Sequence, residues 1–303
     1  MLARLSAPMP TSVRARDGAN GCTKFSRGGV SAARANGARA SRRTTARSRV
    51  RVMPSAASDA SLGTLYDVPV SNNGARVRLT ARWLDLDRRI DVVDPNKAFE
   101  KGIKDAAYAR VNPQMKMPTL VLASGTCLPE SEVICSYLRD VADAAAVGRC
   151  TPESAEARAN AALATRVHDV YLGPIQGAMY RGPMDRKTRA GQIAEIKRQL
   201  DVLEEIAGRT PGDFIAGATR SCADAAIFPT LIFCDFLLPK YFGWREAFGP
   251  NLRRAYEAMM RDAAGKQTYD EVRGGLEAWE KGGRFEKVGV IEDVSDSSFK
   301  WSF

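Results

Sequence analysis

The sequence predicts an α/β domain with the element order βαβαββα, followed by an all-helical domain. Two observations support this division. Short strand-like apolar runs alternate with helical patterns as far as about residue 145, and from residue 152 onward the apolar spacing is helical throughout. The chain has 303 residues, 45% of them hydrophobic, so it is long enough to bury a core in each of two domains.

The first domain is expected at residues 61–145. A strand at 64–70 leads into the turn residues Ser71-Asn72-Asn73-Gly74, and a helix follows with Val77 and Trp83 on its apolar face. Three arginines, Arg76, Arg78 and Arg82, lie mostly on the opposite face of that helix. The remaining elements are a strand at 90–93, a charged helix at 96–109, a hairpin at 117–128 and an amphipathic helix at 130–145. This is the order of a thioredoxin-like domain with a mixed four-stranded sheet.

The all-helical domain is expected at residues 152–283. Thr151-Pro152-Glu153 combines a cap, a proline at the first helical position and an acid in the first turn. Ser221 and Asp224 approximate a capping box at the start of a helix that is apolar on nearly every side, so this helix should be central and buried. The predicted helices span 152–180, 186–207, 221–238, 249–264 and 267–281. Residues 284–303 are expected to form a tail, in which Trp301 and Phe303 have no assigned role.

The excess of basic over acidic side chains is confined to residues 1–60, the leader. Residues 1–60 hold 12 Lys and Arg against two acids, whereas the rest of the chain carries 33 of each sign. The folded part is therefore neutral, and no nucleic-acid partner is expected. A leader rich in Arg, Ser and Ala is typical of an organelle transit peptide, so the chloroplast (plastid) stroma is expected, with the mitochondrion as the alternative. A basic arm that binds nucleic acid is the other interpretation of this segment.

Other site classes have little support. The six cysteines show no C-x-x-C or zinc-finger spacing, and His168 is the single histidine. We therefore expect no disulfide framework and no metal site. The longest apolar stretch, residues 225–239, is interrupted by Pro229 and Asp235 and is too short to span a bilayer.

Five segments in fixed order stand out over about residues 62–279. They are Leu65-Tyr66-Asp67-Val68-Pro69-Val70-Ser71, Arg76-Val77-Arg78, Asn112-Pro113 with Lys116-Met117-Pro118-Thr119-Leu120, Glu130-Ser131 with Ile134 and Tyr137-Leu138, and Phe214-Ile215-Ala216-Gly217 with Ser221-Cys222-Ala223-Asp224. Their order and spacing together resemble the glutathione transferase family. Ser71 followed by Arg76-Val77 is similar to the serine-type plant phi and tau classes, and the overall pattern is also zeta-like.

The resemblance implies a catalytic role for Ser71. A free cysteine thiol has a pKa of about 8.5, so the thiol of glutathione is mostly protonated at neutral pH and is a poor nucleophile. A hydroxyl in the first loop, next to a helix N-terminus, would stabilise the thiolate. The alternative is that Ser71 serves only as a helix N-cap.

The resemblance also implies how glutathione is bound. The peptide bond before Pro118 is expected to be cis, which turns the backbone of Met117 toward the cysteinyl unit. Glu130 and Ser131 would hold the γ-glutamyl end at a helix N-terminus, although capping alone would also explain this pair. Lys116 is one of several lysines able to reach the glycyl carboxylate; Lys97, Lys101 and Lys104 are the others.

The expected activity is conjugation of glutathione, as a co-substrate, to hydrophobic electrophiles held by the helical domain, where His168 and Tyr171 border the acceptor pocket. Glutathione-dependent isomerisation, dehalogenation or peroxide reduction would use the same thiolate. A third alternative is a non-catalytic ligand-binding or assembly module, because fold does not fix function. The resemblance further implies a homodimer.

Overall fold

The structure is a computed structural model, and it describes residues 60–296. The predicted transit peptide lies outside the described residues except for its last one, and Trp301 and Phe303 also lie outside them.

The first domain contains a mixed four-stranded sheet in the order β2-β1-β3-β4. Its strands are β1 (Gly63–Tyr66), β2 (Ile90–Val93), β3 (Thr119–Leu122) and β4 (Cys127–Pro129). β1 pairs with β2 in parallel and with β3 antiparallel, and β3 pairs antiparallel with β4. The predicted sheet is confirmed. Its first strand is shorter than expected, because it ends at Tyr66 and the chain continues as a loop to Ser71.

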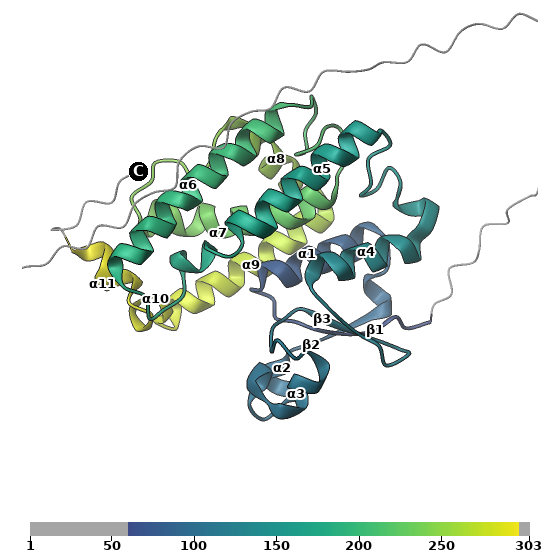
Figure 1. Cartoon of the computed structure of the whole chain (residues 1–303), viewed down its shortest axis with the longest axis horizontal. Helices are drawn as coiled ribbons and strands as arrows, with labels where there is room; N and C mark the ends of the chain where they lie inside the picture. The colour runs from purple at the N-terminus through teal and green to yellow at the C-terminus, as the bar shows by residue number, and fades with distance from the viewer. Residues whose placement is uncertain (1–59, 297–303) are drawn as a thin grey trace, which may run out of the picture. The chain divides into compact units, whose positions relative to one another are not determined.

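Two long helices of this domain, α1 (Asn72–Trp83) and α4 (Ser131–Ala142), lie on one side of the sheet, and α2 and α3 lie on the other (Figure 1). The single helix predicted at 96–109 is wrong. The chain instead forms α2 (Pro95–Ala98), a 3-10 turn at Gly102–Lys104 and α3 (Ala106–Val111). The physical reason is local: Asp94 and Asp105 each cap a new helix, and Gly102 has a φ of 57° between them.

The second domain is all-helical, as predicted. Its helices are α5 (Ala155–Val167), α6 (Arg186–Gly208), α7 (Cys222–Tyr241), α8 (Pro250–Arg261), α9 (Ala263–Lys281), α10 (Arg284–Lys287) and α11 (Val290–Ser295). α5 is shorter than the predicted helix 152–180. It starts after the N-cap Ser154 instead of Thr151, and it continues as a π-helical turn, η4 (His168–Leu172), and a separate 3-10 helix, η5 (Gln176–Met179).

α10 and α11 lie in the segment predicted as a tail. The fully buried Arg189 of α6 attaches them to the helical domain, because its Nε donates to Asp293 of α11 at 2.5 Å. The same guanidinium donates to the carbonyl oxygen of Val288 at 3.2 Å, between the two short helices.

α7 is the central helix of the second domain, and its predicted burial is confirmed. The predicted capping box is also present: Asp224 accepts hydrogen bonds from the backbone and the hydroxyl of Ser221, and from the backbone of Ile215 at 2.9 Å. The sequence predicts that residues 225–239 are too short to span a bilayer, but α7 as a whole has 20 residues and is, by length and composition alone, the one helix among residues 60–296 able to cross a membrane. Most of it is buried inside the fold. A buried core helix passes such a test on composition alone.

Candidate functional site

Three loops leave the sheet side by side. The register pairs Tyr66 at the end of β1 with Thr119 at the start of β3, and Thr119 in turn with Pro129 at the end of β4. The chain segments attached to this row are therefore neighbours. They are the loop from Tyr66 to Ser71, the loop that ends in Pro118, and the start of α4 at Glu130. The sheet brings together the three segments in which the sequence placed the glutathione-binding residues.

Ser71 is the N-cap of α1, and its side chain is half-buried. Its Oγ accepts a hydrogen bond from the backbone N–H of Gly74 at 3.1 Å. A hydroxyl that accepts one bond keeps its own hydrogen for donation, and no acceptor for that hydrogen lies among the described residues. Capping and thiolate stabilisation are therefore compatible roles for one side chain.

The peptide bond between Met117 and Pro118 is cis, as expected. The loop before it is fixed from inside, because the carbonyl oxygen of Lys116 accepts hydrogen bonds from the hydroxyl of Tyr108 at 2.7 Å and from Nδ2 of Asn112 at 2.9 Å. The side chain of Lys116 itself is exposed. A buried polar anchor thus holds the backbone next to the site, while the lysine remains accessible.

Glu130 and Ser131 stand at the N-terminus of α4, where free backbone N–H groups and the positive end of the helix dipole favour an anion. Glu130 is exposed and has a φ of 72°, an uncommon value for a residue other than glycine. Ser131 is 8% exposed, and its Oγ accepts a hydrogen bond from Nη1 of Arg76 at 3.4 Å.

Arg76 is buried, which corrects the expectation that it lies on a polar face of α1, opposite the apolar one. It is 1% exposed and forms ion pairs with Glu132 of α4 and, at 3.0 Å, with Asp169 of η4. Burial opposes its charge, but the neighbouring carboxylates of Asp169 and Glu132 outweigh this effect, and the pKa of Arg76 is raised. Sequence periodicity missed this arginine because its partners are 56 and 93 residues away.

Arg78 is also buried, at 7% exposed, and the same correction applies to it. It forms ion pairs with the buried Asp67 and, at 3.0 Å, with Glu271 of α9. The ion pair with Arg78 compensates the burial of the Asp67 carboxylate. Gly74 is required here, since the carboxylate of Asp67 occupies the space of a side chain at that position.

Of the two side chains predicted to border the acceptor pocket, one is buried and the other is exposed. His168 is 1% exposed; its Nδ1 lies 2.9 Å from Asp169, and its Nε2 lies 2.8 Å from the hydroxyl of Thr230. Tyr171 is 54% exposed. Asn72, next to Ser71, joins the histidine network by donating to Thr230 at 3.1 Å, so α1 and α7 are linked through polar side chains.

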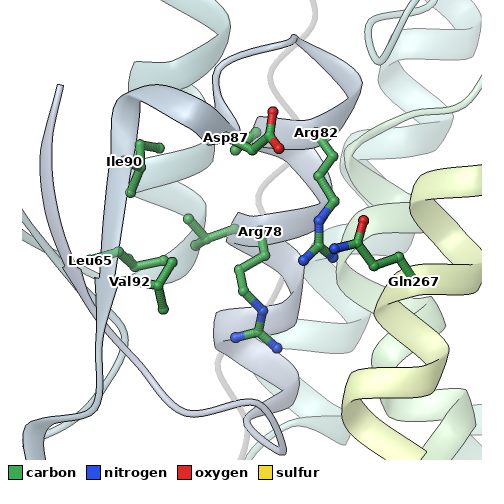
Figure 2. A pocket seen from close by; sticks show the side chains of 9 residues that line it. Leu65, Arg78, Arg82, Asp87, Ile90, Val92 and Gln267 are labelled. Atoms are coloured by element: carbon green, nitrogen blue, oxygen red, sulfur yellow. The ribbon is translucent and has the colours of Figure 1, made fainter. Parts of the chain in front are cut away.

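A cavity of about 150 Å³ lies elsewhere on the first domain, between the sheet, α1 and α9. The wall on the side of the sheet is apolar and includes Leu65, Ile90 and Val92, and the wall on the side of α1 carries Arg78 and Arg82 (Figure 2). A second, more open cavity of about 380 Å³ is bordered by the loop at 213–220 and α8. Neither cavity is lined by Ser71, Pro118 or Ser131. Among the described residues, no group of three His, Cys, Asp or Glu is arranged to hold a metal ion.

The fold and the three neighbouring loops define a two-domain protein in which a thioredoxin-like domain precedes an all-helical domain. Two family models match the sequence in the same order: glutathione S-transferase, N-terminal domain, at residues 65–145, and glutathione S-transferase, C-terminal domain, at residues 185–258. Together they span just over half of the chain, and the chain belongs to the glutathione S-transferase family. A search of curated protein sequences finds no significant match.

Solved structures agree on the fold. The chain is similar to glutathione transferase F2 from Populus trichocarpa, with 18% identity, a TM-score of 0.55, and coverage of 70% of this chain and 99% of that one. It is similar to the glutathione transferase URE2P6 from Phanerochaete chrysosporium in complex with oxidized glutathione, with 21% identity, a TM-score of 0.59, and coverage of 70% and 96%. A bacterial maleyl pyruvate isomerase of the zeta class has 16% identity, a TM-score of 0.55, and coverage of 68% and 95%.

Proposed function

We propose that this protein is a glutathione transferase that stabilises the glutathione thiolate with the hydroxyl of Ser71 and adds the sulfur to hydrophobic electrophiles. The observation that supports this most directly is the row Tyr66, Thr119 and Pro129 across the sheet. Next to this row lie the loop with the Ser71 hydroxyl, the backbone at the cis bond before Pro118, and the N-terminus of α4.

In this proposal the Ser71 hydroxyl donates to the sulfur while it accepts from Gly74. A hydrogen bond to a charged group contributes about 1.5–3 kcal/mol, and one pKa unit corresponds to about 1.36 kcal/mol, so the thiol pKa would fall by about one to two units. The thiol proton leaves to solvent as the thiolate forms, and the thiolate then forms a bond to the electrophilic carbon of the acceptor. In a substitution the leaving group departs from that carbon with the electron pair of its bond; in an addition to a conjugated double bond the π bond opens and its electron pair takes a proton from solvent.

The rest of glutathione would extend across the other two loops. The backbone of Met117, next to the cis bond, would pair with the cysteinyl unit, and Lys116 would reach the glycyl carboxylate. The N–H groups at Ser131 would bind the γ-glutamyl carboxylate, with Glu130 close to the ammonium group. Among the structural relatives, one contains oxidized glutathione, which supports glutathione as the ligand.

Isomerisation, dehalogenation or peroxide reduction would use the same thiolate, and one structural relative is a maleyl pyruvate isomerase. A protein of residues 61–303 should therefore be tested for glutathione binding by calorimetry, and then for turnover of electrophiles, isomerisation substrates and peroxides. Binding with conjugation is the expected result. Binding without any turnover would favour the non-catalytic module, and absence of binding would contradict the proposal.

We also propose that the protein is a homodimer. Large apolar side chains are exposed on α4, α5 and η4, namely Val133, Leu163, Val170 and Tyr171, and a second copy would cover them. Light scattering should give twice the mass of one chain, and the mass of a monomer or trimer would contradict this.

The plastid is the proposed location of the protein. A reporter fused to residues 1–60 should reach the plastid, and a reporter that stays in the cytosol would contradict that assignment.

A further inference from the structure

The loop that carries Ser71 is in close contact with α9 of the helical domain. Val70, which is 9% exposed, packs directly against Gly275. A Cβ atom at Gly275 would lie 2.5 Å from the Cβ of Val70 and 3.0 Å from its Cα, so only glycine allows this approach. Glycine destabilises a helix interior relative to alanine, so the contact with Val70 gives its presence here a structural reason.

A second connection runs through Arg78. Its Nη2 donates to the carbonyl oxygen of Pro69 at 2.8 Å, and its Nη1 donates to that of Val68 at 3.3 Å. The Nε of the same guanidinium donates to Glu271 of α9 at 3.0 Å. Figure 2 shows Arg78 extending from α1 beside the sheet. One side chain therefore ties two consecutive carbonyls of the loop to a carboxylate of the second domain.

We infer that α9 positions the Ser71 hydroxyl, with Gly275 and Glu271 as positioning residues and Arg78 as the link. The inference rests on the proposed function of Ser71. Val68, Pro69 and Val70 directly precede Ser71, so a shift in any of them moves the N-cap. A hydrogen bond to sulfur weakens steeply with distance and misalignment, so a small displacement of the loop would reduce the stabilisation of the thiolate.

The chain offers a matched pair of variants. Gly275→Ala forces Val70 to move, whereas Gly274→Ala, one residue earlier in the same helix, meets nothing within 4 Å. Gly275→Ala should raise the pKa of the bound glutathione thiol by about half a unit or more, because part of the hydrogen bond is lost. At neutral pH its kcat should fall about threefold with little change in the KM for glutathione. Gly274→Ala should match the wild type in both measurements.

Amide hydrogen exchange over residues 68–75 reads the loop without any ligand, and it should be faster in Gly275→Ala than in Gly274→Ala. Glu271→Gln should act in the same direction, whereas Glu277→Gln, which alters an exposed pair with Arg273, should not. Equal exchange and equal thiol titration in both members of each pair would overturn the inference. If the wild type binds no glutathione, the proposed function fails instead, and the exchange comparison alone decides whether α9 holds the loop.

Discussion

Buried charged residues distinguish this site from a simple capped helix. Arg76 contacts Ser131, Glu132 and Asp169, so one guanidinium joins α1, α4 and η4 next to the candidate glutathione site. Burial favours the neutral form of Asp169, but the hydrogen bond from His168 and the charge of Arg76 lower its pKa. A carboxylate whose pKa is lowered by folding stabilises the native state when it is ionised.

Asp169→Asn should therefore destabilise the protein at pH 7, by about 1–3 kcal/mol for a lost hydrogen bond to a charged group. The wild-type contribution is fully present above the ordinary carboxyl pKa of about 4 and is lost as the pH falls through the lowered value. Urea unfolding should show a gap between wild type and variant that is constant from pH 7 to about pH 4 and narrows below it. Asp140→Asn, at an exposed position of α4, is the control. A gap independent of pH would contradict the assigned ion pair.

Glu130→Ala and Ser131→Ala should each raise the KM for glutathione several-fold and change kcat by less than about twofold, since they would contact the γ-glutamyl end, far from the sulfur. Ser136→Ala on the same helix is the control and should leave both constants unchanged. Steady-state kinetics with glutathione as the varied substrate make the comparison. Unchanged KM values in both test variants would mean that the pair only starts α4.

Among the helices, prediction from the sequence was most accurate where a capping motif marked the first residue and a long apolar run continued from it. Ser221 and Asp224 marked the start of α7, and its continuous apolar composition indicated its central place. The prediction failed inside two of the expected helices. Asp105 caps α3 within the helix expected at 96–109, and from His168 the π-helical turn η4 replaces regular α-helix without a side-chain cap.

Asp224→Asn should be among the most destabilising single changes. It removes a carboxylate oxygen that accepts from both the backbone and the hydroxyl of Ser221 in a fully buried position. We expect a loss of about 2–3 kcal/mol, because buried donors are left without an acceptor. Chemical denaturation measures it. Asp235→Asn, elsewhere on α7, alters a partly exposed pair with Arg253 of α8 and should cost about 0.5 kcal/mol. Equal losses in the two variants would contradict the role of the capping box.

Contacts between segments far apart in the chain could not be predicted from the sequence alone. The sheet order could be expected from the element order, and with it the closeness of Ser71, Pro118 and Ser131. The two buried arginines could not, because a helix with alternating Val and Arg also fits a solvent-exposed face. Their acidic partners come from the loop before α1 and from α4, η4 and α9, and only the tertiary packing brings these segments together.

Stabilisation of the glutathione thiolate by Ser71 can be measured by a pH titration of the thiolate absorbance of bound glutathione. In the Ser71→Ala complex the apparent thiol pKa should be higher than in the wild type by about one to two units, because a hydrogen bond of about 1.5–3 kcal/mol is removed. Glutathione affinity should change little. Identical titration curves for the wild-type and Ser71→Ala complexes would contradict the account and leave Ser71 as a helix cap.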